Sequence, residues 1–123
     1  KKETLEHRDY VQEMQVETAK DGYQFTFVIA DIDGYEGENS INQTLYHVQA
    51  ENLEMAAALY QRENERQLDF GHMKQIAADM TGQEIHPLLL ELGHRSGIPK
   101  SVPVMMESDG AKYILRLHRP AFF

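Results

Sequence analysis

The sequence predicts a single domain, residues 1–123, with an α/β (α+β) fold: a mixed, largely antiparallel β-sheet with two or three helices packed on it. Segments in which apolar and polar residues alternate lie near both ends of the chain. Segments with helical apolar spacing lie between them. The 123 residues, 41% hydrophobic and 26% charged, are enough for one modest core.

The first two strands are predicted at residues 9–19 and 23–33. In the second of these segments, aromatic and β-branched side chains alternate with other residues at the period of a strand. Lys20, Asp21 and Gly22 separate the two segments, and the glycine suits the left-handed position of a bulged hairpin turn. We therefore expect an antiparallel hairpin.

An exposed loop is predicted next, at residues 34–43, which collect glycine, asparagine, serine and acidic side chains. Residues 44–50 then alternate again and predict a short strand. Leu45, His47 and Gln49 would share one of its faces.

The first helix is predicted from Asn52 onward, because the side chain of Asn52 can cap the free amides of a first turn. The wholly polar residues 61–66 would form its solvated end. Its apolar residues recur at helical spacing: Leu53, Ala56, Ala57 and Tyr60.

Residues 68–78 are compatible with either a strand or a short helix, and we favour a strand at residues 72–78. His72 lies among apolar residues there. A half-buried imidazole at this position would need a polar partner.

A second helix is predicted around the apolar residues between 85 and 92. Thr81, with a glutamate three residues later, has the spacing of a capping box. Because Pro87 is tolerated only in a first turn, the helix begins near Thr81 or at His86. Gly93 or Gly97 can end it.

The last two segments predict a strand at residues 101–108 and a partner for it at residues 111–118. Pro103 indicates an edge or the start of the first strand, and Gly110 suits the turn that follows. A helix at residues 111–118 remains the alternative.

Composition excludes several classes of function. Twelve Lys and Arg against 20 Asp and Glu give a net charge of −8, which disfavours binding to nucleic acid or to anionic lipid. The absence of cysteine rules out thiolate metal sites and disulfides. No apolar run approaches the roughly 20 residues of a membrane span. Since the chain lacks an initiator Met, we expect a processed product that can have lost a targeting or anchoring segment.

The strongest candidate for chemistry is the pair Asp31 and Asp33, which precede Gly34 as in some cation sites. The calcium-loop pattern is incomplete, so an ordinary acidic turn is the favoured interpretation. The alternative is a metal-dependent hydrolase or small-ligand-binding domain using Asp31, Asp33 and His72. Neither a nucleophile motif nor a phosphate loop is present. We therefore predict no catalytic, cofactor-binding or metal-binding residues.

The stretch LDFGHMK occupies residues 68–74, and further short motifs precede and follow it. In their order along the chain, these motifs resemble the N-terminal domain of the Ger(x)C spore germination lipoproteins, the C-subunits of bacterial germinant receptors. The most telling is LDFGHMK, which is similar to a phenylalanine, glycine, histidine, aliphatic, lysine stretch of that family. The other matching segments are residues 6–12, 14–17, 23–27, 53–59, 87–92 with Arg95, 102–107 and 111–115, the last of which tends to be helical in the family.

The resemblance implies a non-enzymatic accessory or scaffold domain that acts through protein contacts. Its partners would be the other germinant receptor subunits, which are membrane proteins, and not nucleic acid. The resemblance also implies a lipid anchor on an upstream cysteine and an extracytoplasmic position at the spore inner membrane. No cofactor is implied.

Overall fold

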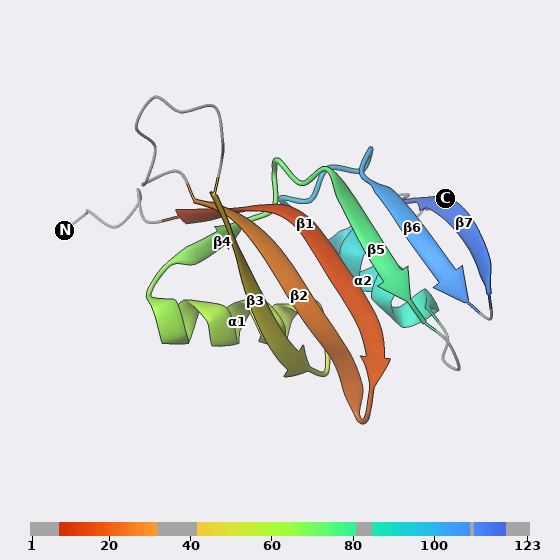
Figure 1. The fold of residues 1–123 in the computed structure, drawn as a ribbon, viewed down its shortest axis with the longest axis horizontal. Coiled ribbons are helices and arrows are strands. Elements are labelled where there is room, and N and C mark those ends of the chain that lie inside the picture. Colours follow the sequence, from red (N-terminus) through yellow and green to blue (C-terminus); the bar gives the residue numbers. More distant parts are fainter. Residues whose placement is uncertain (1–7, 32–41, 81–84, 109, 118–123) are drawn as a thin grey trace.

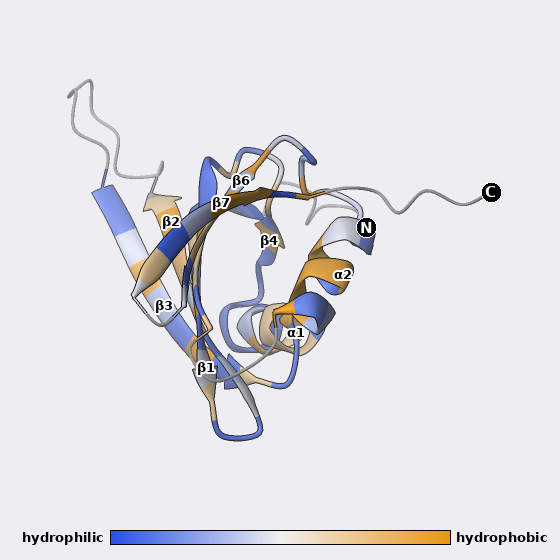
Figure 2. Ribbon diagram, turned by 90° about the vertical axis from the view of Figure 1, so that its right-hand side faces the viewer, coloured by the Kyte–Doolittle hydropathy of each residue, from blue (hydrophilic) through white to orange (hydrophobic). Residues whose placement is uncertain are grey.

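The computed structural model describes residues 8–31, 42–80, 85–108 and 110–117. Within these ranges one seven-stranded sheet carries two helices on the same face (Figures 1 and 2). The strand order is β3-β2-β1-β5-β6-β7, and β4 pairs with β1. The elements are β1 (Arg8–Ala19), β2 (Gly22–Asp31), β3 (Asn42–Ala50), α1 (Leu53–Asn64), β4 (Gln67–Asp69), β5 (Gln75–Asp79), α2 (His86–His94), β6 (Pro103–Ser108) and β7 (Ala111–Arg116).

Pairing in the sheet is mixed, as predicted. The hairpin β1–β2, its extension by β3 and the hairpin β6–β7 are antiparallel. Parallel pairing joins β1 to β4, β1 to β5, and β5 to β6. The predicted α+β class is confirmed, with two helices within the described residues.

A bulge at Gln12 lets one edge of β1 pair with two strands in succession. The register of β1 against β2 shifts between Val11 and Glu13. Before the bulge β1 pairs with β4, and after it β1 pairs with β5. The carbonyl of Gln12 accepts a hydrogen bond from the amide of Lys74 at 2.8 Å, which fixes the chain just before β5.

The core lies between the helices and the face of the sheet that they cover (Figure 2). Phe25 and Phe27 of β2 are fully buried there, and their rings stack at 6.1 Å. Helix α1 contributes Leu53 and helix α2 contributes Leu92, both also fully buried. Alternation along each strand places the intervening side chains on the opposite face.

The β1–β2 hairpin is confirmed, but the residue in the left-handed region is Asp21, with φ 63°. Gly22 has φ 149°, also a conformation that favours glycine. A Cβ atom there would lie 2.5 Å from the carbonyl oxygen of Ala50. Glycine is thus required because β3 ends against the turn.

The predicted strand after the loop is confirmed as β3, which begins at Asn42. Placing residues 42–43 in the exposed loop was therefore wrong, because these residues pair with the end of β2. The rest of the predicted loop, residues 34–41, lies outside the described residues. The first helix is confirmed as α1, and the side chain of Asn52 accepts from the amide of Met55 at 2.8 Å.

The strand favoured at residues 72–78 begins three residues later, because a turn precedes β5. The amide of Gly71 donates to a carboxylate oxygen of Asp69 at 2.8 Å, and the amide of Met73 donates to the carbonyl of Phe70 at 3.3 Å. This turn buries Phe70 and Met73. It leaves His72 exposed, so the expected half-buried imidazole was wrong.

Helix α2 begins at His86 with Pro87 in its first turn, one of the two predicted starts. Thr81 lies outside the described residues. Gly93 does not end the helix but is buried inside it, and Gly97, with φ 91°, follows shortly after. The predicted final hairpin is confirmed as β6–β7, so the helix that the family resemblance suggested at residues 111–115 was wrong.

Candidate functional site

The candidate site is the face of the sheet opposite the helices, here called the open face (Figure 2). It spans the strands from β3 to β7, and its members follow from the strand registers and their alternation. The side chains of the open face belong to Glu13, Gln15, Glu17, Gln24, Thr26, Val28, Leu45, His47, Gln49, Gln75, Ala77, Asp79, Met105, Glu107, Lys112 and Ile114.

A carboxylate row crosses the open face near the C-terminal ends of β1, β5 and β6. Glu17 of β1 pairs with Asp79 of β5, and Asp79 pairs with Glu107 of β6. The next partner in the row is Lys112 of β7. All four residues are exposed. Three acids therefore lie side by side on neighbouring strands, with one ammonium group at the end of the row.

An apolar row lies directly beside the carboxylate row, two residues away along each strand. Its members Ala77, Met105 and Ile114 are successive partners from β5 to β7, and the polar Gln15 of β1 pairs with Ala77 at the end of the row. Met105 is 39% exposed and Ile114 is 58% exposed. The open face thus presents apolar side chains to solvent next to a line of negative charge.

A hollow of about 410 Å³ lies over these two rows, lined by residues of β1, β2, β5, β6 and β7. Ala77 contributes only a methyl group between the longer side chains of Gln15 and Met105, and this shortness deepens the surface there. A second hollow of about 460 Å³ adjoins it at the bulge, where the amide of Gln43 donates to the side-chain oxygen of Gln12 at 2.7 Å.

The β3 side of the open face is held by a side-chain pair. Thr26 and His47, cross-strand partners in β2 and β3, are joined by a hydrogen bond of 2.9 Å between Thr26 Oγ1 and His47 Nδ1. Thr26 is the one buried polar residue among those that the structure describes. The imidazole of His47 gives the buried hydroxyl of Thr26 its hydrogen-bond partner, so the contact of this histidine is a structural one.

On the helix side, Glu91 of α2 fixes the start of α1. Its two carboxylate oxygens accept from the amides of Leu53 and Glu54 at 2.9 and 2.8 Å. These amides belong to the first turn of α1, where a negative charge is favoured. Burial, and then the charge of Glu91, raise the pKa of Tyr23.

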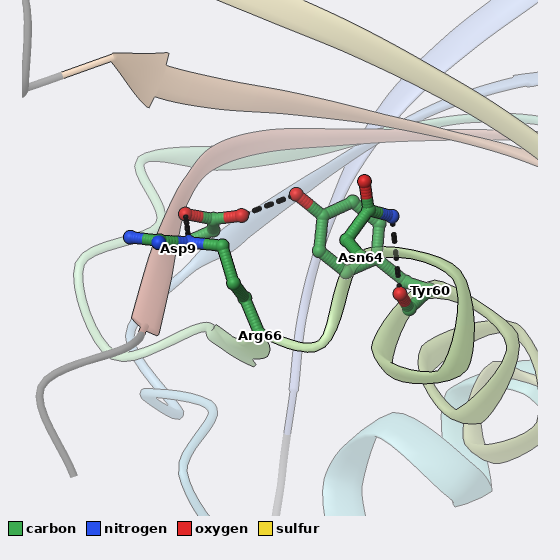
Figure 3. A network of polar contacts seen from close by, with 4 residues as sticks. All are labelled: Asp9, Tyr60, Asn64 and Arg66. Atoms are coloured by element: carbon green, nitrogen blue, oxygen red, sulfur yellow. Dashed lines mark hydrogen bonds and ion pairs between the residues drawn. The ribbon is translucent and has the colours of Figure 1, made fainter. Parts of the chain in front are cut away.

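A polar network joins the start of β1 to the end of α1 and the segment after it (Figure 3). The hydroxyl of Tyr60 donates to one oxygen of Asp9, and Arg66 Nε donates to the other at 2.7 Å. Burial is the largest cause that raises the pKa of Tyr60, followed by its hydrogen bond to Asp9. Nearby, the hydroxyl of Tyr46 donates to Glu63 at 2.6 Å, and burial with this contact raises the pKa of Tyr46 to about 12.

These perturbed tyrosines are explained by packing. The rings of Tyr46 and Tyr60 meet edge to face at 4.6 Å, between β3 and α1. The neutral hydroxyls donate to carboxylates and hold the helix against the sheet. They offer no general base, because a raised pKa keeps the hydroxyl protonated at neutral pH.

A family model described as the spore germination protein N-terminal domain matches residues 1–121. The chain belongs to this family. Comparison with curated proteins and with solved structures returned no significant match. The resemblance inferred from short motifs is therefore confirmed by a match over nearly the whole chain.

Membership of the spore germination protein N-terminal domain family supports a role in a germinant receptor. It also supports an association with the spore. Neither helix of the described structure has the length and apolar character needed to cross a bilayer.

In this spore germination domain, the residues of the predicted metal alternative are not assembled by the described structure. Asp31 is the last residue of β2 and pairs with Asn42, whereas Asp33 lies outside the described residues. His72 is exposed, and its ring meets the edge of Tyr10 at 5.7 Å. Across the described ranges, no group of three or more His, Asp or Glu side chains could hold a metal ion.

The carboxylate row of the germination domain was not predicted from the sequence. Alternation in each strand gives the face of Glu17, Asp79 or Glu107, but only the register between distant strands brings them together. The available signal was an acid two residues after an apolar residue in two separate strands, Ala77 with Asp79 and Met105 with Glu107.

Proposed function

We propose that this domain is a non-enzymatic accessory or scaffold part of a spore germinant receptor, and that it works through protein contacts made by the open face. The observation that carries the proposal is the exposure of Met105 and Ile114 beside a hollow on a broad sheet face. Apolar side chains gathered on a surface and rimmed by polar groups are typical of protein contact sites.

The helix-covered side of the sheet presents fewer unengaged acidic and apolar side chains to a partner. Glu91, Asp9 and Glu63 are each engaged in contacts that hold the helices to the sheet or to each other. The exposed apolar residues on the helices, Met55 and Leu90, belong to different helices, α1 and α2. The open face instead brings six strands to one continuous surface.

The proposed partners are the other subunits of the receptor, which are membrane proteins. We further propose that a lipid on an upstream cysteine anchors the protein on the outer side of the spore inner membrane. The family resemblance supports this arrangement, and the net charge of −8 disfavours direct adhesion to anionic lipid. Metabolic labelling of the full-length protein with a fatty acid tests the anchor, and absence of label contradicts it.

The contact surface is tested with a matched pair of substitutions, Met105→Asp on the open face and Leu90→Asp on α2. Both introduce one charge at an exposed apolar residue. We expect Met105→Asp to abolish co-purification with the receptor's membrane subunits and to slow germination, and Leu90→Asp to leave both unchanged. Circular dichroism of each purified variant checks that the fold is retained.

Equal co-purification of the two variants contradicts the use of the open face. The non-enzymatic part of the proposal is tested separately, by thermal unfolding with added Zn²⁺, Mg²⁺ or Ca²⁺. A specific ion that raises the melting temperature, and does so less after His72→Ala, would favour the metal-dependent alternative with Asp31 and Asp33.

A further inference from the structure

We infer that the open face receives a cationic amphipathic segment of a protein partner, with lysine or arginine side chains over the carboxylate row and an apolar side chain in the hollow. This inference rests on the proposed function and specifies the chemistry of the partner. It follows from the sign of the charges, from their spacing and from the apolar row beside them.

The open face carries a line of negative charges on neighbouring strands. Glu17, Asp79 and Glu107 occupy directly paired positions on three adjacent strands, which are about 4.8 Å apart. Lys112, at the end of the row, carries the one positive charge in this register. With three acids against one lysine, the row presents a net negative potential to an incoming cation.

The spacing restricts the shape of the partner. The carboxylate and apolar rows are two residues apart along each strand, or about 7 Å. A partner must therefore present cationic and apolar side chains about 7 Å apart. An amphipathic helix with a row of basic residues beside a row of apolar residues meets this requirement. Ala77 leaves room for the apolar side chain, between Gln15 and Met105.

Other occupants fit less well. An anionic lipid surface or a nucleic acid would place its phosphates against the carboxylate row. A second copy of the chain, docked by the same surface with the two-fold axis through the carboxylate row, would place one carboxylate row against another. A basic segment of another protein neutralises the row and covers Met105 and Ile114 at the same time.

The test does not depend on the receptor. The whole chain, labelled with nitrogen-15, is titrated with a short synthetic helical peptide that carries a row of lysines beside a row of leucines, and with the same peptide carrying glutamate in place of lysine. We expect the lysine peptide alone to shift amide resonances of open-face residues, including Gln15, Glu17, Ala77, Met105 and Glu107. The shifts should weaken as salt is added.

The variant Glu17→Gln/Glu107→Gln should lower the affinity for the lysine peptide about tenfold, since two partly screened charge contacts are lost. The control variant Glu54→Gln/Glu65→Gln removes the same net charge from exposed positions on α1 and its C-cap, and should bind as the unmodified chain does. Shifts spread over the helices, or equal weakening by the two variants, would overturn the inference.

Co-purification with the receptor subunits tests the proposed function, and titration with the lysine peptide tests the inferred partner chemistry, so a failure of one can be distinguished from a failure of the other. Peptide binding on the open face, with no effect of Met105→Asp on co-purification, would refute the proposed function and support the inferred chemistry. Loss of co-purification in Met105→Asp, with no peptide binding, would support the surface and refute its cationic partner.

Discussion

The hydroxyl of Tyr60 is expected to contribute measurably to the free energy of unfolding. It donates to Asp9, which also accepts from Arg66, and so joins α1 to the first strand (Figure 3). The substitution Tyr60→Phe removes this donor and keeps the ring that packs against Tyr46. Its effect therefore reports the hydrogen bond and not the packing.

The size of the effect follows from the contacts that remain. A hydrogen bond to a charged group contributes about 1.5–3 kcal/mol. Asp9 keeps its bond to Arg66, and its side chain is 17% exposed, so solvent compensates part of the loss. We expect Tyr60→Phe to lower the free energy of unfolding by about 1.5 kcal/mol and the melting temperature by about 6 °C.

The assay is urea unfolding at neutral pH, followed by far-ultraviolet circular dichroism because the chain has no Trp. A double-mutant cycle with Asp9→Asn should give a coupling energy of about 1 kcal/mol. A loss below about 0.3 kcal/mol for Tyr60→Phe, with no coupling to Asp9, would refute the role given to this network.

The raised pKa of Tyr60 also predicts how the free energy of unfolding depends on pH. Because the pKa of Tyr60 is raised in the folded state above the usual 10.0, its contribution to stability is fully present below pH 10. That contribution is lost as the pH rises through the folded pKa. The pKa of Tyr46, raised to about 12, has the same sign. Stability should therefore fall above pH 10, and less steeply in Tyr60→Phe; an unchanged slope would contradict the assignment.

Three further substitutions test the local structure. Glu91→Ala removes the acceptor of two amides at the start of α1 and should lower the free energy of unfolding in urea by about 2–3 kcal/mol. Glu91→Gln should lower it less, because one acceptor remains. Negligible losses in both variants would contradict the role of Glu91 as a cap. Gly22→Ala should cost about 3 kcal/mol, because its Cβ would meet the carbonyl of Ala50; normal stability would show that the turn can move. Glu65→Gly should raise stability by about 0.5–1 kcal/mol, because Glu65 has φ 57°; a loss would contradict the left-handed cap.

Most strands could be predicted from the sequence because one face of the sheet is buried and the other is exposed. Alternation along β2, β3 and β6 identified these strands, and Asn52 identified the start of α1. The break between β4 and β5 could not be predicted in the same way. It depends on a turn closed by Asp69 and on the bulge in β1, which are set by contacts between distant parts of the chain.

The candidate site was less accessible to prediction than the fold. A strand pattern specifies which side chains share a face, but not which strands become neighbours or in what register. Glu17 and Asp79 lie far apart in the chain and meet because β5 pairs in parallel with β1. Conversely, the apolar neighbours of His72 suggested burial, whereas the turn buries Phe70 and Met73 and exposes the imidazole.

Site-specific photocrosslinking in intact spores shows directly which face of the domain contacts the receptor. A photoreactive amino acid is placed at Ile114 on the open face or at Leu90 on α2, both more than half exposed. The account predicts a covalent adduct with a membrane subunit of the receptor from position 114 and none from position 90. An adduct from position 90 alone would contradict it.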